Sequence, residues 1–276
     1  MLRERISEDI YVFTSQLYAQ VTSGVIFTSR GAILVDTLPF PRESAQLRGF
    51  IQEHSPQKVR YVINTHSHAD HVYGSYLFPE ARVVAHKLCR ENLLRFGEKG
   101  LEQAKEQNPE LYEVRLRLPS ITFEGELTLH LGNKTLHLIP SPGHTSDSIV
   151  VYVKEDKVLF AGDTIMPVPY IVWGSKEELI ASLRTLEELP LENIVQGHGE
   201  VLLRGEVKET IETSIAYLER IEQKVKEMVV SGAPRKELDK IDIEQCGKSR
   251  IPLNGLVQQL HRANLYKLYD KLKAEK

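Results

Sequence analysis

Short apolar runs, separated by polar or glycine-containing breaks, dominate the first three-quarters of the chain. Three of them lie between residues 11 and 37, with breaks at Ser15, Ser23-Gly24 and Arg30-Gly31, and further runs cover residues 59–63, 82–85 and much of 121–160. Runs of this length between such breaks are typical of β-strands. Apolar residues at helical spacing predict a helix over residues 43–53, and a charged helical region follows over residues 88–107. The pattern predicts an α/β protein.

The pattern changes beyond residue 205, where two apolar stripes recur at helical spacing. The stripes are Ile215, Leu218, Ile221, Val225 and Met228, and then Val257, Leu260, Leu265, Leu268 and Leu272. Breaker-rich segments at 231–234 and 246–252 separate the two predicted helices. An apolar stripe needs a surface that covers it. We therefore expect residues 206–276 to form a C-terminal helical extension that packs on the core of residues 1–205 or forms a dimer contact.

A histidine-rich segment, Thr65-His66-Ser67-His68-Ala69-Asp70-His71, directly follows the strand-like residues 59–63. In an extended loop at a strand end, His66 and His68 project to the same side, and Asp70 and His71 follow where the chain can turn. Imidazole and carboxylate groups together are typical ligands of zinc and neighbouring transition metals. The segment therefore predicts a metal site.

Three more polar side chains stand just past the ends of strand-like runs, each beside a glycine. They are His144, Asp163 and His198. Strand ends commonly collect the ligands of a site in open sheets, so we expect these side chains to converge on the histidine-rich segment. The remaining histidines lie where a surface or core role is expected, namely His54, His86, His130, His137 and His261.

The order T-H-x-H-x-D-H, P-G-H-T, G-D-T and G-H-G resembles the metallo-β-lactamase-fold hydrolase superfamily, with the ligand set of its glyoxalase II-like and lactonase-like members. The resemblance covers about the first three-quarters of the chain. It implies a four-layer αβ/βα sandwich, with two mixed β-sheets face to face, helices outside and two metals at one edge. In this family, insertions at the place of residues 88–120 often shape access to the metals, so we expect a wall or lid there.

The resemblance also implies a role for each ligand position. The first metal would be bound by His66, His68 and His144, the second by Asp70, His71 and His198, and Asp163 would bridge the two. Two divalent ions are expected, with zinc preferred over iron or manganese. Asp36, after an early strand as in the family, is a candidate to orient a ligating histidine. Thr65, Thr145 and Thr164 could serve in the same way, although a capping or turn role is expected for them.

Two close cations lower the pKa of a bound water from near 16 toward about 7, so a hydroxide between them is a nucleophile at neutral pH. The resemblance therefore implies a hydrolase that acts on an ester, lactone, thioester or amide. Asp70 is placed to orient the hydroxide as well as to bind metal. Tyr170 is a candidate proton donor to the leaving group, with metal-bound water as the alternative.

The sequence differs from the patterns of two named subfamilies, and these differences narrow the range of expected substrates slightly. True β-lactamases usually have cysteine or serine where Asp163 stands, so only weak, promiscuous β-lactamase activity is expected. Residues 165–170 do not resemble the glutathione-recognition segment of glyoxalase II enzymes, which argues against a glutathione thioester. Two alternatives stay open: a phosphodiesterase or nuclease-like hydrolase, and a mononuclear iron dioxygenase that oxidises a persulfide.

Composition is that of an ordinary globular enzyme. The chain has 276 residues, is 41% hydrophobic and carries a net charge of −3, which argues against a polyanion-binding surface. Its two cysteines, Cys89 and Cys246, do not indicate a disulfide framework. No apolar run approaches a membrane span, and the charged start lacks the core of a signal peptide. We expect a cytoplasmic monomer or homodimer that binds a small-molecule substrate, with no nucleic acid or membrane partner.

Overall fold

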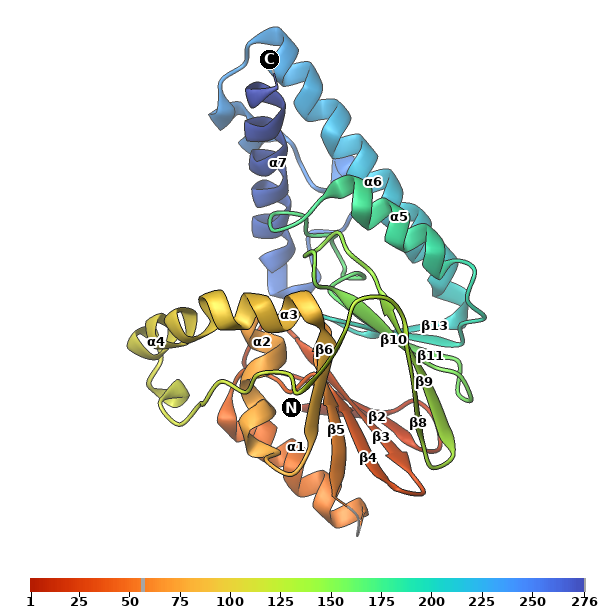
Figure 1. Ribbon diagram of the computed structural model, residues 1–276. Helices are drawn as coiled ribbons and strands as arrows, with labels where there is room; N and C mark the ends of the chain where they lie inside the picture. The colour runs from red at the N-terminus through yellow and green to blue at the C-terminus, as the bar shows by residue number, and fades with distance from the viewer. Residues whose placement is uncertain (56–57, 276) are drawn as a thin grey trace.

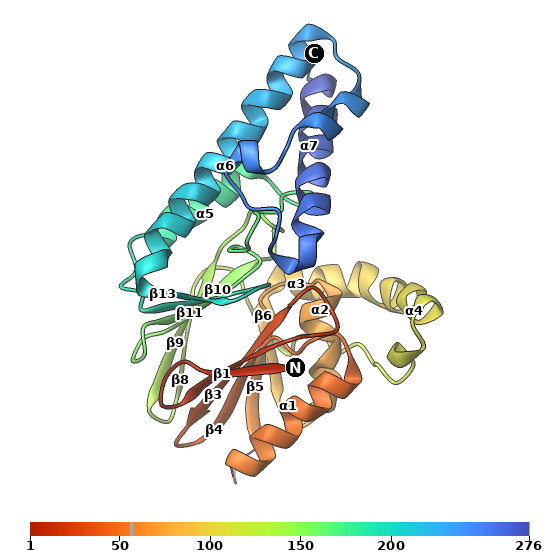
Figure 2. The ribbon, with the colours of Figure 1, turned by 180° about the vertical axis from the view of Figure 1, so that it is seen from behind.

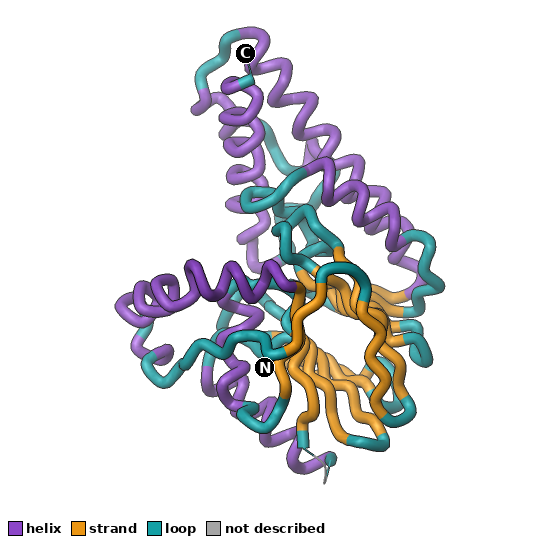
Figure 3. The backbone as a smooth tube through the Cα atoms, viewed as in Figure 1, coloured by secondary structure: helices purple, strands orange, loops and turns teal. Residues whose placement is uncertain are grey.

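Two β-sheets face each other in the computed structural model, and helices cover their outer sides (Figure 1 and Figure 3). The structure describes residues 1–55 and 58–275. The predicted αβ/βα sandwich is confirmed by this arrangement.

The first sheet has its seven strands in chain order. They are β1 (Leu2–Arg5), β2 (Ile10–Thr14), β3 (Thr22–Thr28), β4 (Gly31–Val35), β5 (Val59–Ile63), β6 (Arg82–His86) and β7 (Ile121–Phe123). β1 to β4 pair antiparallel, and β4 to β7 pair parallel. The parallel half brings the carboxyl ends of β4, β5 and β6 to one edge, where the histidine-rich segment begins.

The second sheet has six strands in the order β13-β12-β11-β10-β9-β8. They are β8 (Leu127–Leu131), β9 (Lys134–Pro140), β10 (Ile149–Val153), β11 (Val158–Gly162), β12 (Asn193–Gln196) and β13 (Val201–Leu203). All neighbours pair antiparallel except β11 and β12, which are parallel. β11 and β12 therefore end at the same edge, and Asp163 and His198 lie just beyond them.

Side chains alternate along the strands, so each sheet packs one face against the other sheet and its opposite face against helices. On β10, Val151 faces the core between the two sheets, while Val150 faces the helices outside. Successive strand residues point to opposite faces, and both faces are covered here. β10 accordingly reads as a continuous apolar run, with all five of its residues buried.

Seven α-helices accompany the sheets in the described part of the chain. They are α1 (Pro41–His54), α2 (Ala69–Val72), α3 (Lys87–Asn92), α4 (Glu98–Gln107), α5 (Lys176–Leu186), α6 (Arg204–Ser231) and α7 (Leu256–Ala274). α1 covers the outside of the first sheet through Leu47, Phe50 and Ile51. α5, α6 and α7 share one apolar cluster with the outer face of the second sheet.

The two C-terminal helices lie side by side and extend away from the sheets (Figure 1 and Figure 2). Their apolar stripes, represented by Leu218 and Ile221 on α6 and by Val257 and Leu265 on α7, are buried in the same cluster as β10 and β11. Gly232 ends α6 with a left-handed φ of 72°, a conformation that glycine adopts without a steric penalty.

The structure adds features that the sequence pattern did not predict. β1 is an edge strand whose four residues are all exposed, so it shows no apolar alternation. A π-helical turn at Leu93–Gly97 divides the helical region predicted over residues 88–107 into α3 and α4. The helix predicted over residues 43–53 begins earlier, because Pro41 occupies its first turn, where proline is well tolerated.

Within the described residues, no helix combines the length and apolar character needed to cross a bilayer. Cys89 and Cys246 are buried and unpaired, so no disulfide links these two residues.

Candidate metal centre

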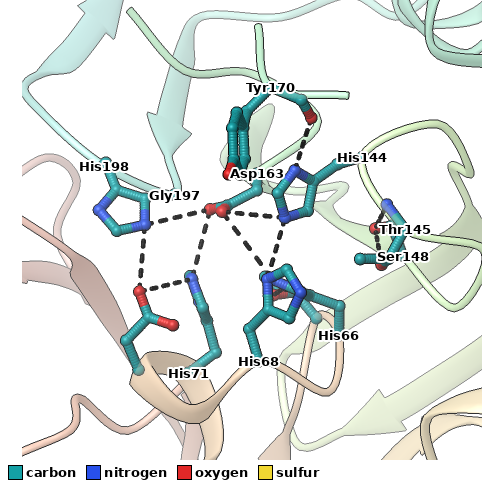
Figure 4. Close-up of polar contacts among 12 residues, drawn as sticks. His66, His68, His71, His144, Thr145, Ser148, Asp163, Tyr170, Gly197 and His198 are labelled. Carbon is teal, nitrogen blue, oxygen red and sulfur yellow. Dashed lines mark hydrogen bonds and ion pairs between the residues drawn. The ribbon is translucent and has the colours of Figure 1, made fainter. Parts of the chain in front are cut away.

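The predicted ligand side chains gather at one edge between the two sheets. His66 and His68 lie in the loop after β5, and Asp70 and His71 lie on the short helix α2 that follows. The remaining three come from the second sheet, with His144 in the turn between β9 and β10, Asp163 after β11 and His198 after β12 (Figure 4). The sheets position the site because each contributes strand ends to this edge.

Ligand atoms of these residues form two groups, each with its atoms within 4.8 Å of one another. The groups are His66, His68, His144 and Asp163, and then Asp70, His71 and His198. In the first group, Nδ1 of His68 lies 3.1 Å from Nε2 of His144. In the second, Nε2 of His198 lies 3.3 Å from Oδ2 of Asp70.

Asp163 belongs to the first group but also faces the second, so that one carboxylate oxygen points to each set of histidines. Its Oδ2 is 3.3 Å from Nε2 of His144 and 3.9 Å from Nε2 of His66. Its Oδ1 is 3.3 Å from Nε2 of His71 and 3.5 Å from Nε2 of His198. This division is what a carboxylate shared by two cations requires. Gly197 permits the close approach, since a Cβ there would overlap Oδ1 of Asp163.

Hydrogen bonds to Nδ1 fix how the histidines present their rings. His144 donates from Nδ1 to the carbonyl oxygen of Tyr170 at 2.8 Å, and His198 donates from Nδ1 to the carbonyl oxygen of Ala19 at 2.9 Å. His71 donates from Nδ1 to Oδ2 of Asp36 at 2.8 Å. A neutral imidazole that donates from Nδ1 keeps a lone pair on Nε2. Three Nε2 atoms thereby face Asp163 with Nδ1 already engaged, so each is free to bind a metal ion.

Asp36 supports two of the histidines. Besides His71, its Oδ2 accepts a hydrogen bond from Oγ1 of Thr65 at 2.7 Å, and its Oδ1 accepts one from the backbone nitrogen of Thr65 at 2.8 Å. Since the Thr65 hydroxyl donates to Asp36, it accepts from Nδ1 of His66 at 3.1 Å. Thr65 thus orients His66, which is the less favoured of the two roles that the sequence left open for it. Asp36 adopts φ of 56°, a strained conformation of the kind found at functional sites.

The donor set fits a bound metal. Nε2 of His66, Nε2 of His71 and Oδ1 of Asp163 are buried without a hydrogen-bond partner among the described residues, although such groups are normally satisfied. Donor atoms around a tetrahedral zinc ion lie about 3.3 Å apart, close to the 3.1 Å between His68 and His144. Nitrogen and carboxylate donors suit zinc and its neighbours. These residues form a metal-binding His/Asp cluster.

Burial and the neighbouring charges shift the pKa values in opposite directions across the cluster. Burial, with His144 beside it, lowers the pKa of His68 to about 4. Burial also opposes the charged forms of Asp70 and His198, but their neighbours dominate. His71 and His198 lower the pKa of Asp70 to about 2, while Asp163 and Asp70 raise that of His198 to about 10. Without metal, His198 therefore holds a proton that a cation would displace.

Three further residues at the site were not predicted from the sequence. Tyr18 interacts electrostatically with Asp70 and Asp163, which with burial raise the pKa of its phenol to about 12. Trp173 is 69% exposed, and its ring lies 6.5 Å from that of His68. The carbonyl of Ala19 orients His198. A backbone carbonyl leaves no sequence signal, whereas the single tryptophan close after the G-D-T motif was a signal that could have been used.

Tyr170 lies beside the cluster, with its ring above Asp163 and next to His144 (Figure 4). Burial raises the pKa of its phenol, so the hydroxyl stays protonated at neutral pH. Of the other histidines, His261 is buried and hydrogen-bonded within the helical extension, away from the cluster. A wall or lid over residues 88–120 stays a prediction, supported by one contact from Nδ2 of Asn92 to Oγ of Ser67 at 3.4 Å.

Comparisons with known proteins identify the family to which this cluster of residues belongs. The family model described as the metallo-beta-lactamase superfamily matches residues 18–198 of this chain. That range contains the complete His/Asp cluster.

Two curated relatives and one solved structure illustrate the similarity. A beta-lactamase-like protein 2 homolog of Caenorhabditis elegans is 24% identical over 217 residues, covering 78% of this chain and 66% of that protein. An acyl-coenzyme A thioesterase of Homo sapiens is 26% identical over 165 residues, covering 56% of this chain and 58% of that protein. This chain therefore spans about two thirds or less of these relatives. A metallo-beta-lactamase from Pontibacter korlensis superposes with a TM-score of 0.61 at 21% identity, over 76% of this chain and 97% of that one, which shows the shared fold.

Proposed function

Because this chain belongs to the metallo-beta-lactamase superfamily, as the match over residues 18–198 shows, we propose that it is a hydrolase that uses two divalent metal ions to cleave acyl thioesters. The resemblance that the motifs indicated is thereby confirmed at the level of the family. The dinuclear state, the choice of zinc and the thioester substrate are the proposal.

The observation that carries the dinuclear proposal is the position of Asp163. One of its oxygens faces His66 and His144, and the other faces His71 and His198. A single ion would need only one of these oxygens. His66, His68 and His144 would then bind the first ion, Asp70, His71 and His198 the second, and Asp163 both.

When bound, divalent ions supply Lewis acidity and make a water nucleophilic near neutral pH. The protein supplies orientation. Asp36 and the carbonyls of Tyr170 and Ala19 hold the Nδ1 protons of His71, His144 and His198, so that each ring offers Nε2. Asp70 adds a carboxylate whose ionised form its histidine neighbours favour. It is the residue that we assign to orienting the nucleophile.

The thioester proposal draws on a relative and on the rim of the site. A relative named as an acyl-coenzyme A thioesterase shares 26% identity with this chain over 165 residues. Trp173 and Tyr18 stand at the rim with 69% and 46% of their surfaces exposed, and aromatic side chains of this kind bury the apolar part of a ligand well. An acyl chain fits such an aromatic rim better than a phosphodiester backbone does.

The test is turnover of the zinc-loaded protein on matched substrates of different chemistry. The panel is an octanoyl-coenzyme A thioester, an aryl octanoate ester, a lactone, a β-lactam, an aryl phosphodiester and a persulfide. We expect thioester cleavage with two zinc ions per chain, and a loss of about 100-fold or more in Asp163→Ala. Asp156→Asn is the matched control, because Asp156 pairs with Lys134 and lies in the turn between β10 and β11, at the opposite end of these strands from His144 and Asp163.

Other outcomes would replace the proposal. Cleavage of the phosphodiester alone would favour a nuclease-like hydrolase. A preparation that contains one iron and oxidises the persulfide, without thioester cleavage, would favour a dioxygenase. Activity confined to the oxygen ester or lactone would keep the two-metal hydrolase and change only the acyl substrate.

A further inference from the structure

A buried amide on the last helix holds the loop that carries Tyr170. Asn264 on α7 is fully buried, and its Oδ1 accepts a hydrogen bond from the backbone nitrogen of Ile171 at 3.0 Å. Its Nδ2 donates to the carbonyl oxygen of Pro169 at 2.7 Å. One side chain therefore binds the backbone on both sides of Tyr170, more than 90 residues away in sequence.

A directional hydrogen-bond chain fixes the orientation of this amide. His261 donates from Nε2 to the carbonyl oxygen of Ile241 at 3.0 Å, so its Nδ1 accepts from the hydroxyl of Tyr217 at 2.9 Å. The Tyr217 oxygen in turn accepts from Nδ2 of Asn264 at 3.3 Å. At each group in this chain, the hydrogen bond already made decides whether the group donates or accepts in the next one. The positions of the nitrogen Nδ2 and the oxygen Oδ1 of Asn264 are therefore unambiguous. Burying these polar groups costs free energy unless all are paired, and here they are.

The segment that Asn264 holds acts directly on the metal centre. The carbonyl of Tyr170, between the two bonds to Asn264, accepts the Nδ1 proton of His144 at 2.8 Å. This bond directs Nε2 of His144 toward Oδ2 of Asp163 and Nδ1 of His68. If the loop shifts, the carbonyl leaves the plane of the imidazole, and His144 loses the partner that sets its tautomer and angle.

We propose that Asn264 is a positioning residue for the metal centre. It acts through the backbone of residues 169–171 and the ring of His144, and Tyr217 and His261 keep it oriented. The C-terminal helices α6 and α7 are then a working part of the site, since they set the affinity and geometry of the group that contains His144. The inference rests on the proposed function only in that His144 binds a metal ion there.

Zinc affinity of purified variants tests the proposal, measured by competition with a chromophoric chelator. Asn264→Asp keeps the size and the acceptor for Ile171 but cannot donate to Pro169 while ionised. Groups that orient a ligating histidine typically change metal affinity by about 10- to 100-fold, and we expect a loss in that range. Tyr217→Phe, which removes only the hydroxyl behind Asn264, should give a smaller loss in the same direction.

Tyr269→Phe is the matched control. Tyr269 is also a buried polar residue of α7, but its hydroxyl donates to the carbonyl of Ala233 just beyond the end of α6, at 2.8 Å, and not to the Tyr170 loop. We expect it to lower the melting temperature as much as Tyr217→Phe does and to leave zinc affinity unchanged. A second readout is the Nδ1 proton resonance of His144 in the NMR spectrum, which should shift or broaden in Asn264→Asp and not in Tyr269→Phe.

Zinc affinity and a His144 resonance equal to those of the parent protein, in folded Asn264→Asp and Tyr217→Phe, would overturn the proposal and leave Asn264 a purely structural residue. If Asn264→Asp fails to fold, Tyr217→Phe decides alone. A parent protein that binds zinc without cleaving any acyl substrate would remove the proposed function, while the effect of Asn264 on zinc affinity would stand.

Discussion

Oδ2 of Asp36 lies 2.8 Å from Nδ1 of His71, and the two side chains are 5% and 0% exposed. This buried contact decides which nitrogen of His71 faces the cluster. An ionised carboxylate has no proton to donate and can only accept, so Nδ1 carries the proton and Nε2 is left for a metal. The same carboxylate reaches His66 through Thr65. One residue of β4's end thus orients a histidine in each of the two groups.

Asp36→Asn should weaken zinc binding by about 10- to 100-fold. The amide of the variant would either donate an N–H to Nδ1 of His71 or leave Nδ1 without a partner. In both cases the ring would favour the tautomer with its proton on Nε2. Competition with a chelator gives the affinity. Asp156→Asn, which removes a carboxylate paired with Lys134, should keep the affinity of the parent. Equal zinc affinity in the two variants would contradict the orienting role of Asp36.

Asp70→Ala should lower kcat more than it changes substrate binding. We expect a loss of about 100-fold in kcat at saturating zinc, with KM within about 3-fold, because an interaction made mainly in the transition state affects kcat. Metal content has to be measured alongside, since Asp70 is also a proposed ligand. Unchanged turnover at full zinc content would exclude the role in orienting the nucleophile.

Tyr170→Phe tests the proton donor. If the phenol protonates the leaving group, kcat for an alkyl ester or amide should fall by about 100-fold. A thioester or aryl ester should be affected much less, because its leaving group needs little protonation. The carbonyl of Tyr170 remains in the variant, so the contact to His144 is kept. A uniform effect on all substrates would instead indicate a role in binding.

Zinc affinity should rise with pH. In the metal-free protein Asp163 and Asp70 outweigh burial and raise the pKa of His198 to about 10. Below that pH the ring keeps its proton, which zinc must displace, so each displaced proton gives about a tenfold gain in affinity per pH unit between pH 6 and 9. His198→Gln should lower the slope of log zinc affinity against pH by about one, because one proton fewer is displaced. An affinity independent of pH would show that the second group is not protonated before it binds metal.

Lys248 should make stability depend on pH. Burial lowers the pKa of its ammonium to about 8, although Nζ donates to Ser214 and Thr213 at 3.0 and 3.2 Å. In the unfolded chain a lysine titrates near 10.4. Between these two values the unfolded state binds more protons, so this group's contribution to stability rises as pH rises through that window and is unfavourable below pH 8.

The comparison with Lys248→Met isolates this effect. From pH 8 to pH 10 the melting temperature of the parent should rise relative to that of the variant by several degrees, since 1 kcal/mol corresponds to about 2–4 °C in a domain of this size. Lys208→Met is the control, because the Lys208 side chain is 82% exposed on α6. If the melting temperatures of the parent and the variant change in parallel over this pH range, the lowered pKa of Lys248 is ruled out.

The sequence was informative where the signal is local. His66, His68, Asp70 and His71 lie within one short segment, and His144, Asp163 and His198 each follow a strand directly, so their types and strand-end positions were readable from the chain alone. β1 was missed because an exposed edge strand has no apolar alternation to detect. The stripes of α6 and α7 were readable because a helix that buries one face repeats its apolar residues every 3.6 residues.

What the sequence by itself determined is the set of chemical groups and the family fold that brings strand ends together. Only the tertiary structure decided how those groups are oriented. The carbonyls of Ala19 and Tyr170 hold His198 and His144, and Asn264 holds the Tyr170 loop from a helix more than 90 residues away. Every residue has a carbonyl, and a lone asparagine in a helix carries no periodic signal. Such contacts are set by long-range packing, so they become visible only once the chain is folded.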